Sequence, residues 1–254
     1  MRDVFAFGLA FVIGTVSACG TSGDRTADGL EREVLVSAAT SLTDAFAEIE
    51  RAFEAAHPGV DVVVNLAASS TLREQIVQGA PVDVFASADL ATMDSVVTAG
   101  RAAGTPVVFA ENTPEIAVPA GNPGDVMGLA DFGRADLIIG LCAEAVPCGA
   151  IAREALRRAG VVPDVDSNEA NVRALLTKIE LGEIDAGIVY ATDVLAARGR
   201  VEGIAIPDDD DLKARYPLVA LTDAPHPDAA AAFVAFVLSD RGRSILTAHG
   251  FAAP

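Results

Sequence analysis

The chain has 254 residues, enough for one large domain or for two smaller lobes with a hydrophobic core. Its formal net charge is -18 at pH 7. It therefore has no basic surface to displace counterions from a nucleic acid, and we exclude that class of partner. Hydrophobic residues make up 51% of the chain and aromatic residues only 5%, which favours an α/β fold whose helices pack through small side chains.

The N-terminus has the pattern of an exported chain. After the short basic start, Val4 to Val16 form an apolar run about as long as the core of a signal peptide and short for a membrane span. Val16-Ser17-Ala18-Cys19 resembles a bacterial lipobox, which implies cleavage before Cys19 and a lipid on its sulfur; an ordinary secretory signal is the alternative. We expect a signal peptide over residues 1–18 and a flexible tether over residues 19–32. The chain would then lie outside the cytoplasm, held to the membrane by its lipid alone.

From residue 33 onward, short β-rich runs alternate with stretches of helical periodicity. In the first half we predict strands at 34–36, 60–66 and 82–86, helices at 42–56, 71–78 and 90–99, and extended segments at 107–110 and 116–119. In the second half we predict strands at 137–141, 186–190 and 216–221, and helices at 150–159, 171–181, 227–238 and 241–248. The acidic run Asp208–Asp211 predicts a solvated loop. This alternation predicts mainly parallel sheets.

The rhythm of strands and helices restarts near residue 115, which predicts two α/β lobes. We expect the first lobe to contain residues 33–113 and 222–254, because the last helices can return to it, and the second lobe to contain residues 114–221. The crossovers between the lobes are then expected near 111–115 and 220–224.

Two cysteines remain once Cys19 is assigned to the lipid. Cys142 and Cys148 are separated by five residues that include Pro147. A close pair in an exported chain favours a disulfide, with two reduced buried thiols as the alternative. A metal site is disfavoured, because two sulfurs are too few ligands and no histidine lies near them in the sequence.

Four turns rich in small, hydroxyl or amide side chains precede predicted helices. They lie within Ala38–Asp44, Ala67–Leu72, Val146–Gly149 and Ser167–Arg173. The first N–H groups of a helix have no partner inside the helix and carry the positive end of its dipole, so several converging ends can hold an anion without Lys or Arg. The alternative is that these residues are ordinary helix caps, and Ser41 with Asp44 has the form of a capping box.

Longer blocks carry a resemblance to a known family. Ala38–Phe46 reads Ala-Ala-Thr-Ser-Leu-Thr-Asp-Ala-Phe, Ala68–Ile76 reads Ala-Ser-Ser-Thr-Leu-Arg-Glu-Gln-Ile, and Gly79–Asp89 reads Gly-Ala-Pro-Val-Asp-Val-Phe-Ala-Ser-Ala-Asp. Together with Val146–Gly149, Asn171–Leu175 and Asp185–Asp193, they closely resemble the molybdate-binding proteins of ABC transporters, in order from residue 33 to Phe251. The resemblance implies a two-lobed periplasmic-binding-protein fold of type II, each lobe a mainly parallel sheet flanked by helices, with the ligand in the cleft between the lobes.

The resemblance also implies which residues contact the oxyanion. Each of them offers an O–H or N–H donor: Ser41, Ser69, Cys148, Val172 and Tyr190, with Thr40 and Ser70 as further donors. Cys148 and Val172 would act through their backbone N–H groups, and Tyr190 through its phenol. Cys148 stands where the family usually has Ala. Ala68 stands where the family usually has Ser or a similar residue, so position 68 lacks that side-chain donor.

The implied ligand is molybdate or tungstate, each a dianion without protons that only accepts hydrogen bonds. Sulfate suits such a site equally, whereas hydrogen phosphate needs an acceptor, and we expect the nearby Asp44 to be occupied at its own helix N-terminus. No cofactor and no catalytic residue are expected, and the only metal would be that of the oxyanion itself. The expected protein is a monomer whose lobes close by hinge motion and which docks on an ABC permease.

Rivals of other classes are an exported Ser hydrolase using Ser41 or Ser69, and a structural surface lipoprotein. The hydrolase lacks a Gly-x-Ser-x-Gly elbow and a suitably placed His. Among the remaining polar residues, Arg73 and Arg173 are interpreted as solvated or ion-paired helix residues, with charge compensation for the anion as the alternative. We expect backbone or cap roles for Asp83 and Asp89, and turn positions without a catalytic or metal role for the histidines, which are His57, His226 and His249.

Overall fold

The computed structural model describes residues 25, 29–207 and 212–254. The expected signal peptide, the expected lipid-bearing Cys19, most of the expected tether and the acidic run Asp208–Asp211 lie outside the described residues. In the described part of the chain, no helix is both long and apolar enough to cross a bilayer.

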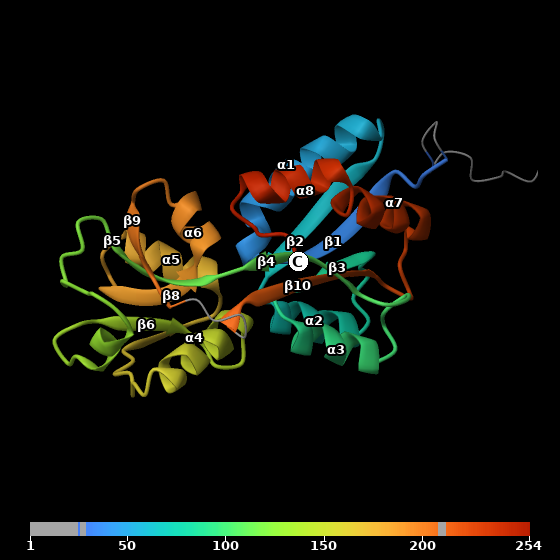
Figure 1. The fold of residues 1–254 in the computed structure, drawn as a ribbon. Coiled ribbons are helices and arrows are strands. Elements are labelled where there is room, and N and C mark those ends of the chain that lie inside the picture. The colour runs from blue at the N-terminus through green and yellow to red at the C-terminus, as the bar shows by residue number, and fades with distance from the viewer. Residues whose placement is uncertain (1–24, 26–28, 208–211) are drawn as a thin grey trace, which may run out of the picture.

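Two five-stranded sheets divide the described chain into two lobes, which confirms the expected two-lobed α/β fold (Figure 1). The first sheet has the order β2-β1-β3-β10-β4, with β1 at Glu33–Ala39, β2 at Asp61–Ala67, β3 at Val84–Ala86, β4 at Val107–Asn112 and β10 at Ala214–Ala220. The second has the order β7-β6-β8-β5-β9, with β5 at Pro114–Pro119, β6 at Ile139–Cys142, β7 at Ser167–Glu169, β8 at Ala186–Tyr190 and β9 at Val201–Ala205.

Helices flank each sheet. The first lobe carries the short 3-10 helix η1 (Thr40–Leu42), α1 (Thr43–Ala56), α2 (Ser69–Val77), α3 (Leu90–Thr98), α7 (Pro227–Val237) and α8 (Asp240–Ala248). The second lobe carries η2 (Leu129–Gly133), α4 (Pro147–Arg158), α5 (Val172–Glu180) and α6 (Ala191–Ala196). The sequence analysis did not predict η2, α6, β7 or β9. These elements are too short for the alternation of apolar and polar residues to reveal a helix or a strand.

Both sheets contain more antiparallel pairing than the sequence predicted. In the first sheet, β1 pairs in parallel with β2 and β3, whereas β10 pairs antiparallel with β3 and β4. In the second, β6 pairs in parallel with β7 and β8, whereas β5 pairs antiparallel with β8 and β9. The strands β5 and β10 are the first that the chain forms after crossing between the lobes, so no helical crossover within their own sheet constrains their direction.

The sheet order corrects the second lobe boundary. The first crossing falls at Thr113, between β4 and β5. The second crossing precedes β10, which lies in the first sheet, so residues 214–220 belong to the first lobe and not to the second. The prediction of a crossover near 220–224 was therefore wrong. The extended pattern of residues 216–221 was recognised, but an extended segment alone does not reveal which sheet it joins.

The folded part also begins earlier than residue 33. Arg25 forms an ion pair with Glu31 at 3.0 Å, and Glu31 Oε2 accepts a hydrogen bond of 2.9 Å from the backbone N–H of Ala229 in the first turn of α7. A carboxylate at a helix N-terminus is favoured by the helix dipole. This part of the expected tether is consequently attached to the first lobe.

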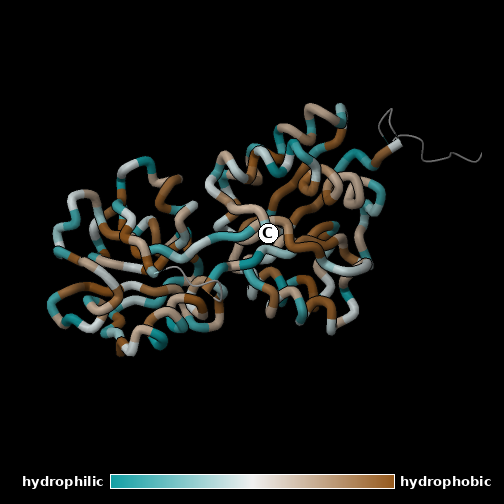
Figure 2. The backbone as a smooth tube through the Cα atoms, in the orientation of Figure 1, coloured by the Kyte–Doolittle hydropathy of each residue, from teal (hydrophilic) through white to brown (hydrophobic). Residues whose placement is uncertain are grey.

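The apolar periodicity of the sequence accounts for the cores. Along α1, the buried residues Ala45, Phe46, Ile49 and Phe53 recur at the helical spacing that places them on one face. Phe53 meets Phe233 of α7 with ring centroids 5.2 Å apart, nearly edge to face. Hydrophobic segments follow the strands inside each lobe, whereas hydrophilic segments gather on the outside (Figure 2).

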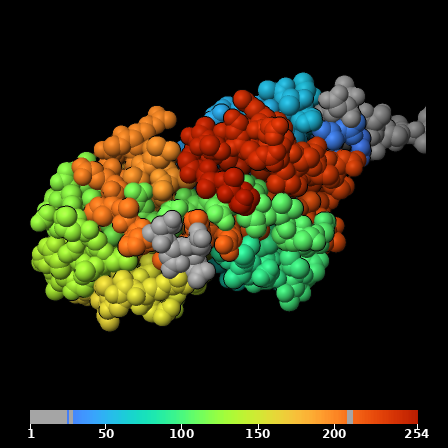
Figure 3. Space-filling view, in the orientation of Figure 1, coloured from blue at the N-terminus to red at the C-terminus, as the bar shows by residue number. Residues whose placement is uncertain are grey.

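The parallel strands of each sheet direct their carboxyl ends toward the other lobe. Turns follow β1, β2 and β3 in the first lobe and β6, β7 and β8 in the second. The space-filling view shows the middle of the chain, coloured yellow-green to orange, against the lobe that holds the C-terminal helices in red (Figure 3). In sheets of this kind, ligands bind beyond the carboxyl ends of the strands.

Candidate oxyanion site between the lobes

A small cavity lies where the turns of the two lobes meet. Its wall is formed from both sides by Ala39, Thr40, Ser41, Ala68, Ser69, Ala88, Val146, Pro147, Cys148, Asn171, Val172 and Tyr190. Its volume is about 20 Å³, counted as the space open to the centre of a water-sized sphere. Wider clefts of about 750 Å³ and 510 Å³ adjoin it, the first sharing Ser41 and the second sharing Tyr190.

The structure brings together nearly all the residues predicted as ligand contacts. Those that line the cavity are Thr40, Ser41, Ser69, Cys148, Val172 and Tyr190. Ser70 does not line it, because it follows Ser69 within α2, and one residue along a helix turns the side chain by roughly 100°. Ala68 does line it, at a position where this chain has no side-chain donor.

Helix N-termini supply backbone donors to the wall. The helix α2 begins at Ser69 and α4 at Pro147, and in the described structure neither end receives a hydrogen bond from a capping side chain. The helix α5 begins at Val172, where the side chain of Asn171 accepts the N–H of Ala174 at 3.0 Å. Ser69, Cys148 and Val172 lie in the first turns of these helices and line the cavity, so the positive ends of three helix dipoles meet there.

Ser41 and Asp44 do not form the capping box that their spacing predicts. The residue that caps α1 is Leu42, and in the described structure its side chain makes no capping hydrogen bond. Asp44 instead pairs with Arg173 of α5 in the other lobe, with Oδ2 and Nη2 2.5 Å apart. The expectation that Asp44 binds its own helix N-terminus was wrong, because a cation from the opposite lobe is available to it.

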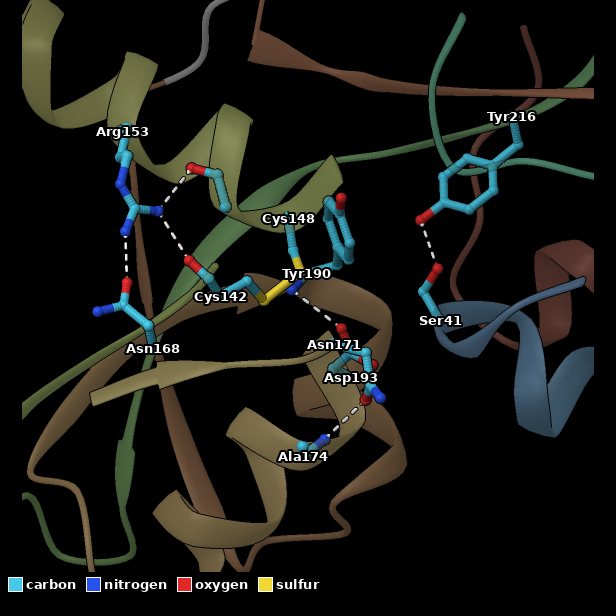
Figure 4. The surroundings of a disulfide bond; sticks show 11 residues. Ser41, Cys142, Cys148, Arg153, Asn168, Asn171, Ala174, Tyr190, Asp193 and Tyr216 are labelled. Carbon is cyan, nitrogen blue, oxygen red and sulfur yellow. Dashed lines mark hydrogen bonds between the residues drawn. A yellow bond between two sulfur atoms is a disulfide. The ribbon is translucent and has the colours of Figure 1, made fainter. Parts of the chain in front are cut away.

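Tyr190 closes the cavity from the second lobe. Its ring is buried, with 2% of the residue exposed, and its Oη has no hydrogen-bond partner among the described residues. Burial raises the pKa of Tyr190 well above its ordinary value, and Tyr216, Asp193 and Asp89 act in the same direction. The phenol thus keeps its proton and offers an unused donor beside the cavity (Figure 4).

The two serines accept hydrogen bonds from within the protein. Ser69 Oγ accepts the backbone N–H of Ala88 at 3.0 Å, and Ser41 Oγ accepts the O–H of Tyr216 at 2.9 Å. The sequence analysis assigned no role to Ala88 or Tyr216. Their only signal in the sequence was weak: Ala88 lies in the block Gly79–Asp89 that carries the family resemblance, and Tyr216 is one of two tyrosines in the chain.

A disulfide joins Cys142 at the end of β6 to Cys148 in the first turn of α4. The turn between them is further held by Arg153, whose Nη1 donates to the carbonyl oxygens of Cys142 and Gly149 at 2.7 and 3.2 Å (Figure 4). Gly149 allows the close approach of this turn to the helix, since a Cβ there would lie 1.9 Å from the carbonyl oxygen of Ala143. The backbone N–H of Cys148 is therefore presented by a tightly fixed loop.

Asp193 is buried behind Tyr190 and accepts the backbone N–H of Tyr190 at 3.1 Å. Burial raises the pKa of Asp193 to about 7, although the Tyr190 N–H and Arg173 lower it; Asp44 raises it further. The sequence analysis did not single out this residue.

The other polar residues have structural partners. Arg73 pairs with its neighbour Glu74 at 3.0 Å. His226 contacts Asp83, and His249 contacts Glu48, both at 2.9 Å. Asp89 accepts the N–H of Thr92 and so caps α3.

His57 packs against Phe53 with the ring centroids 4.4 Å apart. Within the described ranges, no group of three or more His, Cys, Asp or Glu side chains is placed to hold a metal ion.

Comparison with known proteins agrees with this geometry. Over residues 34–252 the chain matches the family described as bacterial extracellular solute-binding protein. It is 38% identical over 249 residues to the molybdate-binding protein ModA of Mycobacterium tuberculosis (strain ATCC 25618 / H37Rv), covering 96% of this chain and 95% of that protein. Two α/β lobes around a cavity lined by donors define a two-lobed binding protein. The chain belongs to the family of bacterial extracellular solute-binding proteins.

Solved structures show the same fold. The periplasmic molybdate-binding protein of Azotobacter vinelandii superposes with a TM-score of 0.76 at 21% identity, covering 87% of this chain and 99% of that one. The sulfate-binding protein SubI of Mycobacterium tuberculosis H37Rv gives 0.75 at 19% identity, covering 87% and 86%. These near-equal scores mean that the fold by itself does not distinguish the two ligands.

Proposed function

We propose that this chain captures molybdate between its two lobes and delivers it to the permease of an ABC transporter. The observation that carries the proposal is the buried Tyr190 Oη, which lacks a partner in the described structure and lies in the wall of a cavity formed by both lobes. An unsatisfied buried donor costs about 1–3 kcal/mol, so its presence favours a ligand that supplies the acceptor.

The donors of the cavity suit an anion without protons. Hydroxyl groups of Ser41, Ser69 and Tyr190 and the N-termini of α2, α4 and α5 surround it, and no carboxylate is among the described residues of its wall. Molybdate, tungstate and sulfate present only acceptors, whereas hydrogen phosphate also presents a proton that would meet no carboxylate. A neutral donor set also explains how a chain of net charge -18 can hold an anion.

Identity to a molybdate-binding relative supports molybdate over sulfate. The molybdate-binding relative is 38% identical, whereas the sulfate-binding structure is 19% identical. Tungstate has the same charge and shape as molybdate, and we propose that it binds as well. The choice between these ions and the smaller sulfate then depends on the size of the closed cavity, since all of them present the same acceptors.

Binding requires the lobes to separate and close again. The cavity of about 20 Å³ admits roughly one water by this measure, and a tetrahedral oxyanion is larger. The chain crosses between the lobes at Thr113, between β4 and β5, so rotation about this connection can widen the cavity. Closure on the anion would then complete the donor set and bury the charge.

The remaining features of the proposal concern the whole protein. We propose that the chain makes and breaks no bond, that it is exported and anchored through lipid on Cys19, and that it acts as a monomer toward its permease. A relative that is named as a binding protein supports a binding role without catalysis. The N-terminal lipobox pattern supports the lipid anchor.

Isothermal titration of the full chain in detergent with molybdate, tungstate, sulfate and phosphate tests the function. We expect tight binding of molybdate and tungstate, weak binding of sulfate and the weakest binding of phosphate. Sulfate binding as tight as that of molybdate would make the chain a general tetrahedral-oxyanion binder. Absence of binding to all four anions would refute the proposal.

A further inference from the structure

Ser41 stands at the end of a chain of buried hydrogen bonds that begins at the crossover between the lobes. Asn112 is the last residue of β4, and its Nδ2 lies 2.7 Å from Thr192 Oγ1 in the second lobe and 3.4 Å from Tyr216 Oη in the first. Tyr216 Oη lies 2.9 Å from Ser41 Oγ (Figure 4). Asn112, Tyr216 and Ser41 are all buried, which shields these contacts from bulk water.

The hydrogen bonds of this chain run from Asn112 through Tyr216 to Ser41. Asn112 Oδ1 accepts the backbone N–H of Thr113 at 3.0 Å, which places the amide nitrogen toward Tyr216 and Thr192. An amide nitrogen can only donate. Tyr216 Oη is therefore an acceptor for Asn112, and it donates its own proton to Ser41 Oγ, 2.9 Å away. Burial raises the pKa of Tyr216, so the phenol keeps that proton to donate.

Ser41 is thereby left with a proton and no internal acceptor. In the described structure the single hydrogen bond of its side chain is the one received from Tyr216, and the residue lines the cavity. Ser69 is in the same condition, because its Oγ accepts the backbone N–H of Ala88. Hydroxyl groups normally adapt, since each can donate or accept. In the described structure each of the two serines receives one hydrogen bond and gives none, so its proton is available to an acceptor in the cavity.

We propose that Tyr216, oriented by Asn112, is a positioning residue that fixes Ser41 as a donor and so makes the site selective against oxyanions that carry a proton. The inference rests on the proposed function and deepens it. Without the Tyr216 hydroxyl, Ser41 could rotate and accept a proton from hydrogen phosphate. With it, a ligand proton given to Ser41 Oγ would leave the Ser41 proton without an acceptor, because Tyr216 already donates to the same oxygen.

The test compares the affinities for molybdate and phosphate of the full chain and its Tyr216→Phe variant, at a mildly alkaline pH where phosphate is a dianion with one proton. The ring contacts of Tyr216 with Phe109, Tyr190 and Phe251 are preserved by phenylalanine. We expect molybdate to bind about threefold to tenfold more weakly, the size expected for one hydrogen bond. The affinity for phosphate should fall less than that for molybdate, or should rise. The dissociation constant for phosphate divided by that for molybdate should therefore decrease by about threefold or more.

Two controls separate positioning from a general loss of binding. Tyr190→Phe removes a hydroxyl that has no internal partner, so it should weaken both anions and leave their ratio unchanged. In a Ser41→Ala background, Tyr216→Phe should have no further effect on the ratio, because the residue through which it acts is missing. If Tyr216→Phe changes the ratio of the phosphate and molybdate dissociation constants as much in the Ser41→Ala background as in the wild-type chain, the proposal is overturned.

Asn112→Asp provides a second variant if Tyr216→Phe fails to fold. The carboxylate would accept from Tyr216 and so reverse the chain, withdrawing the Ser41 proton from the cavity. We expect the molybdate-to-phosphate ratio to narrow as in Tyr216→Phe, whereas an effect of charge alone would weaken both dianions equally and count against the proposal. If the wild-type chain does not bind molybdate, the proposed function fails. If it does bind and Tyr216→Phe keeps the wild-type ratio, only the positioning role fails.

Discussion

At the scale of single residues, the cavity is defined by groups that donate. Tyr190 is the clearest of them, because a phenol buried to 2% exposure would normally find a partner, and its Oη has none in the described structure. Burial raises the pKa of Tyr190 well above its ordinary value, so the phenol is a neutral donor at neutral pH. The role of Tyr190 can be tested by the substitution Tyr190→Phe, which removes only the hydroxyl group.

Tyr190→Phe should weaken molybdate binding by about 1.5–3 kcal/mol, the value of a hydrogen bond to a charged group. Because the unsatisfied hydroxyl destabilises the empty protein, the variant should be as stable as the wild type or slightly more stable without ligand. Titration calorimetry and thermal unfolding measure the two effects. An unchanged affinity would show that Tyr190 does not contact the ligand.

Asp193 gives the site a pH-dependent stability. Burial raises its pKa from the ordinary 3.8 to about 7 in the folded chain. Between these values the folded protein holds a proton that the unfolded chain releases, so the contribution of Asp193 is most favourable at low pH and is lost as the pH rises through about 7.

Asp193→Asn should remove this part of the pH dependence while keeping an acceptor for the Tyr190 N–H. The free energy of unfolding of the wild type, relative to the variant, should fall by at most about 1.4 kcal/mol per pH unit between the two pKa values. Urea unfolding of both proteins across this range measures the difference. Parallel curves for the two proteins would mean that Asp193 ionises normally.

At the scale of elements, helices meet the cavity with their N-termini, and the connection between β6 and α4 shows how such an end is held. The disulfide of Cys142 and Cys148, the contacts of Arg153 and the missing side chain of Gly149 all fix this turn. A backbone donor is useful to a ligand only when its direction is constant. The turn therefore has the rigidity that the Cys148 N–H needs.

Replacing both Cys142 and Cys148 by Ala should lower the free energy of unfolding by about 2 kcal/mol, since the disulfide closes a short loop. Molybdate affinity should fall as well, because the turn that presents the Cys148 N–H gains freedom. Denaturant unfolding with and without ligand measures both changes. If the disulfide forms, thiol titration of the unfolded exported protein should find no free thiol at Cys142 or Cys148. Two free thiols at these positions would contradict the disulfide.

At the scale of the whole molecule, the lobes touch beside the cavity, at the wider cleft of about 750 Å³, through Asp44 of α1 and Arg173 of α5. The Asp44 side chain is 50% exposed and that of Arg173 is 32% exposed, so this pair is screened and contributes modestly, at about 0–1 kcal/mol. Because it joins the two lobes, its energy is present only when they are closed. Loss of this ion pair should therefore change the dissociation rate of the ligand more than the free energy of unfolding.

Asp44→Asn should speed the dissociation of molybdate by up to about fivefold, the limit set by an exposed ion pair. Arg173→Gln should do the same and also remove a positive charge near the ligand, so its effect should be larger. Stopped-flow displacement at low and high salt measures the rates, and high salt should reduce the difference between Asp44→Asn and the wild type. A dissociation rate unchanged in Asp44→Asn at low salt would show that the pair does not hold the lobes together.

Much of this arrangement follows from local sequence. The helical spacing of Phe46, Ile49 and Phe53 and the small turns after the strands predict the elements, because each depends on residues a few positions apart. The resemblance of the turn motifs added the residues of the cavity, and Ser41, Ser69 and Tyr190 do lie together. Whether they contact a ligand is a prediction for the experiments above.

The tertiary structure decided what depends on residues distant in the chain. The membership of β10 in the first sheet, the pairing of Asp44 with Arg173 and the contact of Tyr216 with Ser41 join segments that no short pattern relates. Local spacing even misled at Asp44, where it indicated a cap and the opposite lobe supplied a cation instead. The sequence by itself thus determined most of the longer elements and, through the resemblance, most of the residues that line the cavity. The direction in which those donors are held was decided only when the crossing strands brought Asn112, Tyr216 and Ser41 into contact, because a hydroxyl takes its role from its neighbours in space.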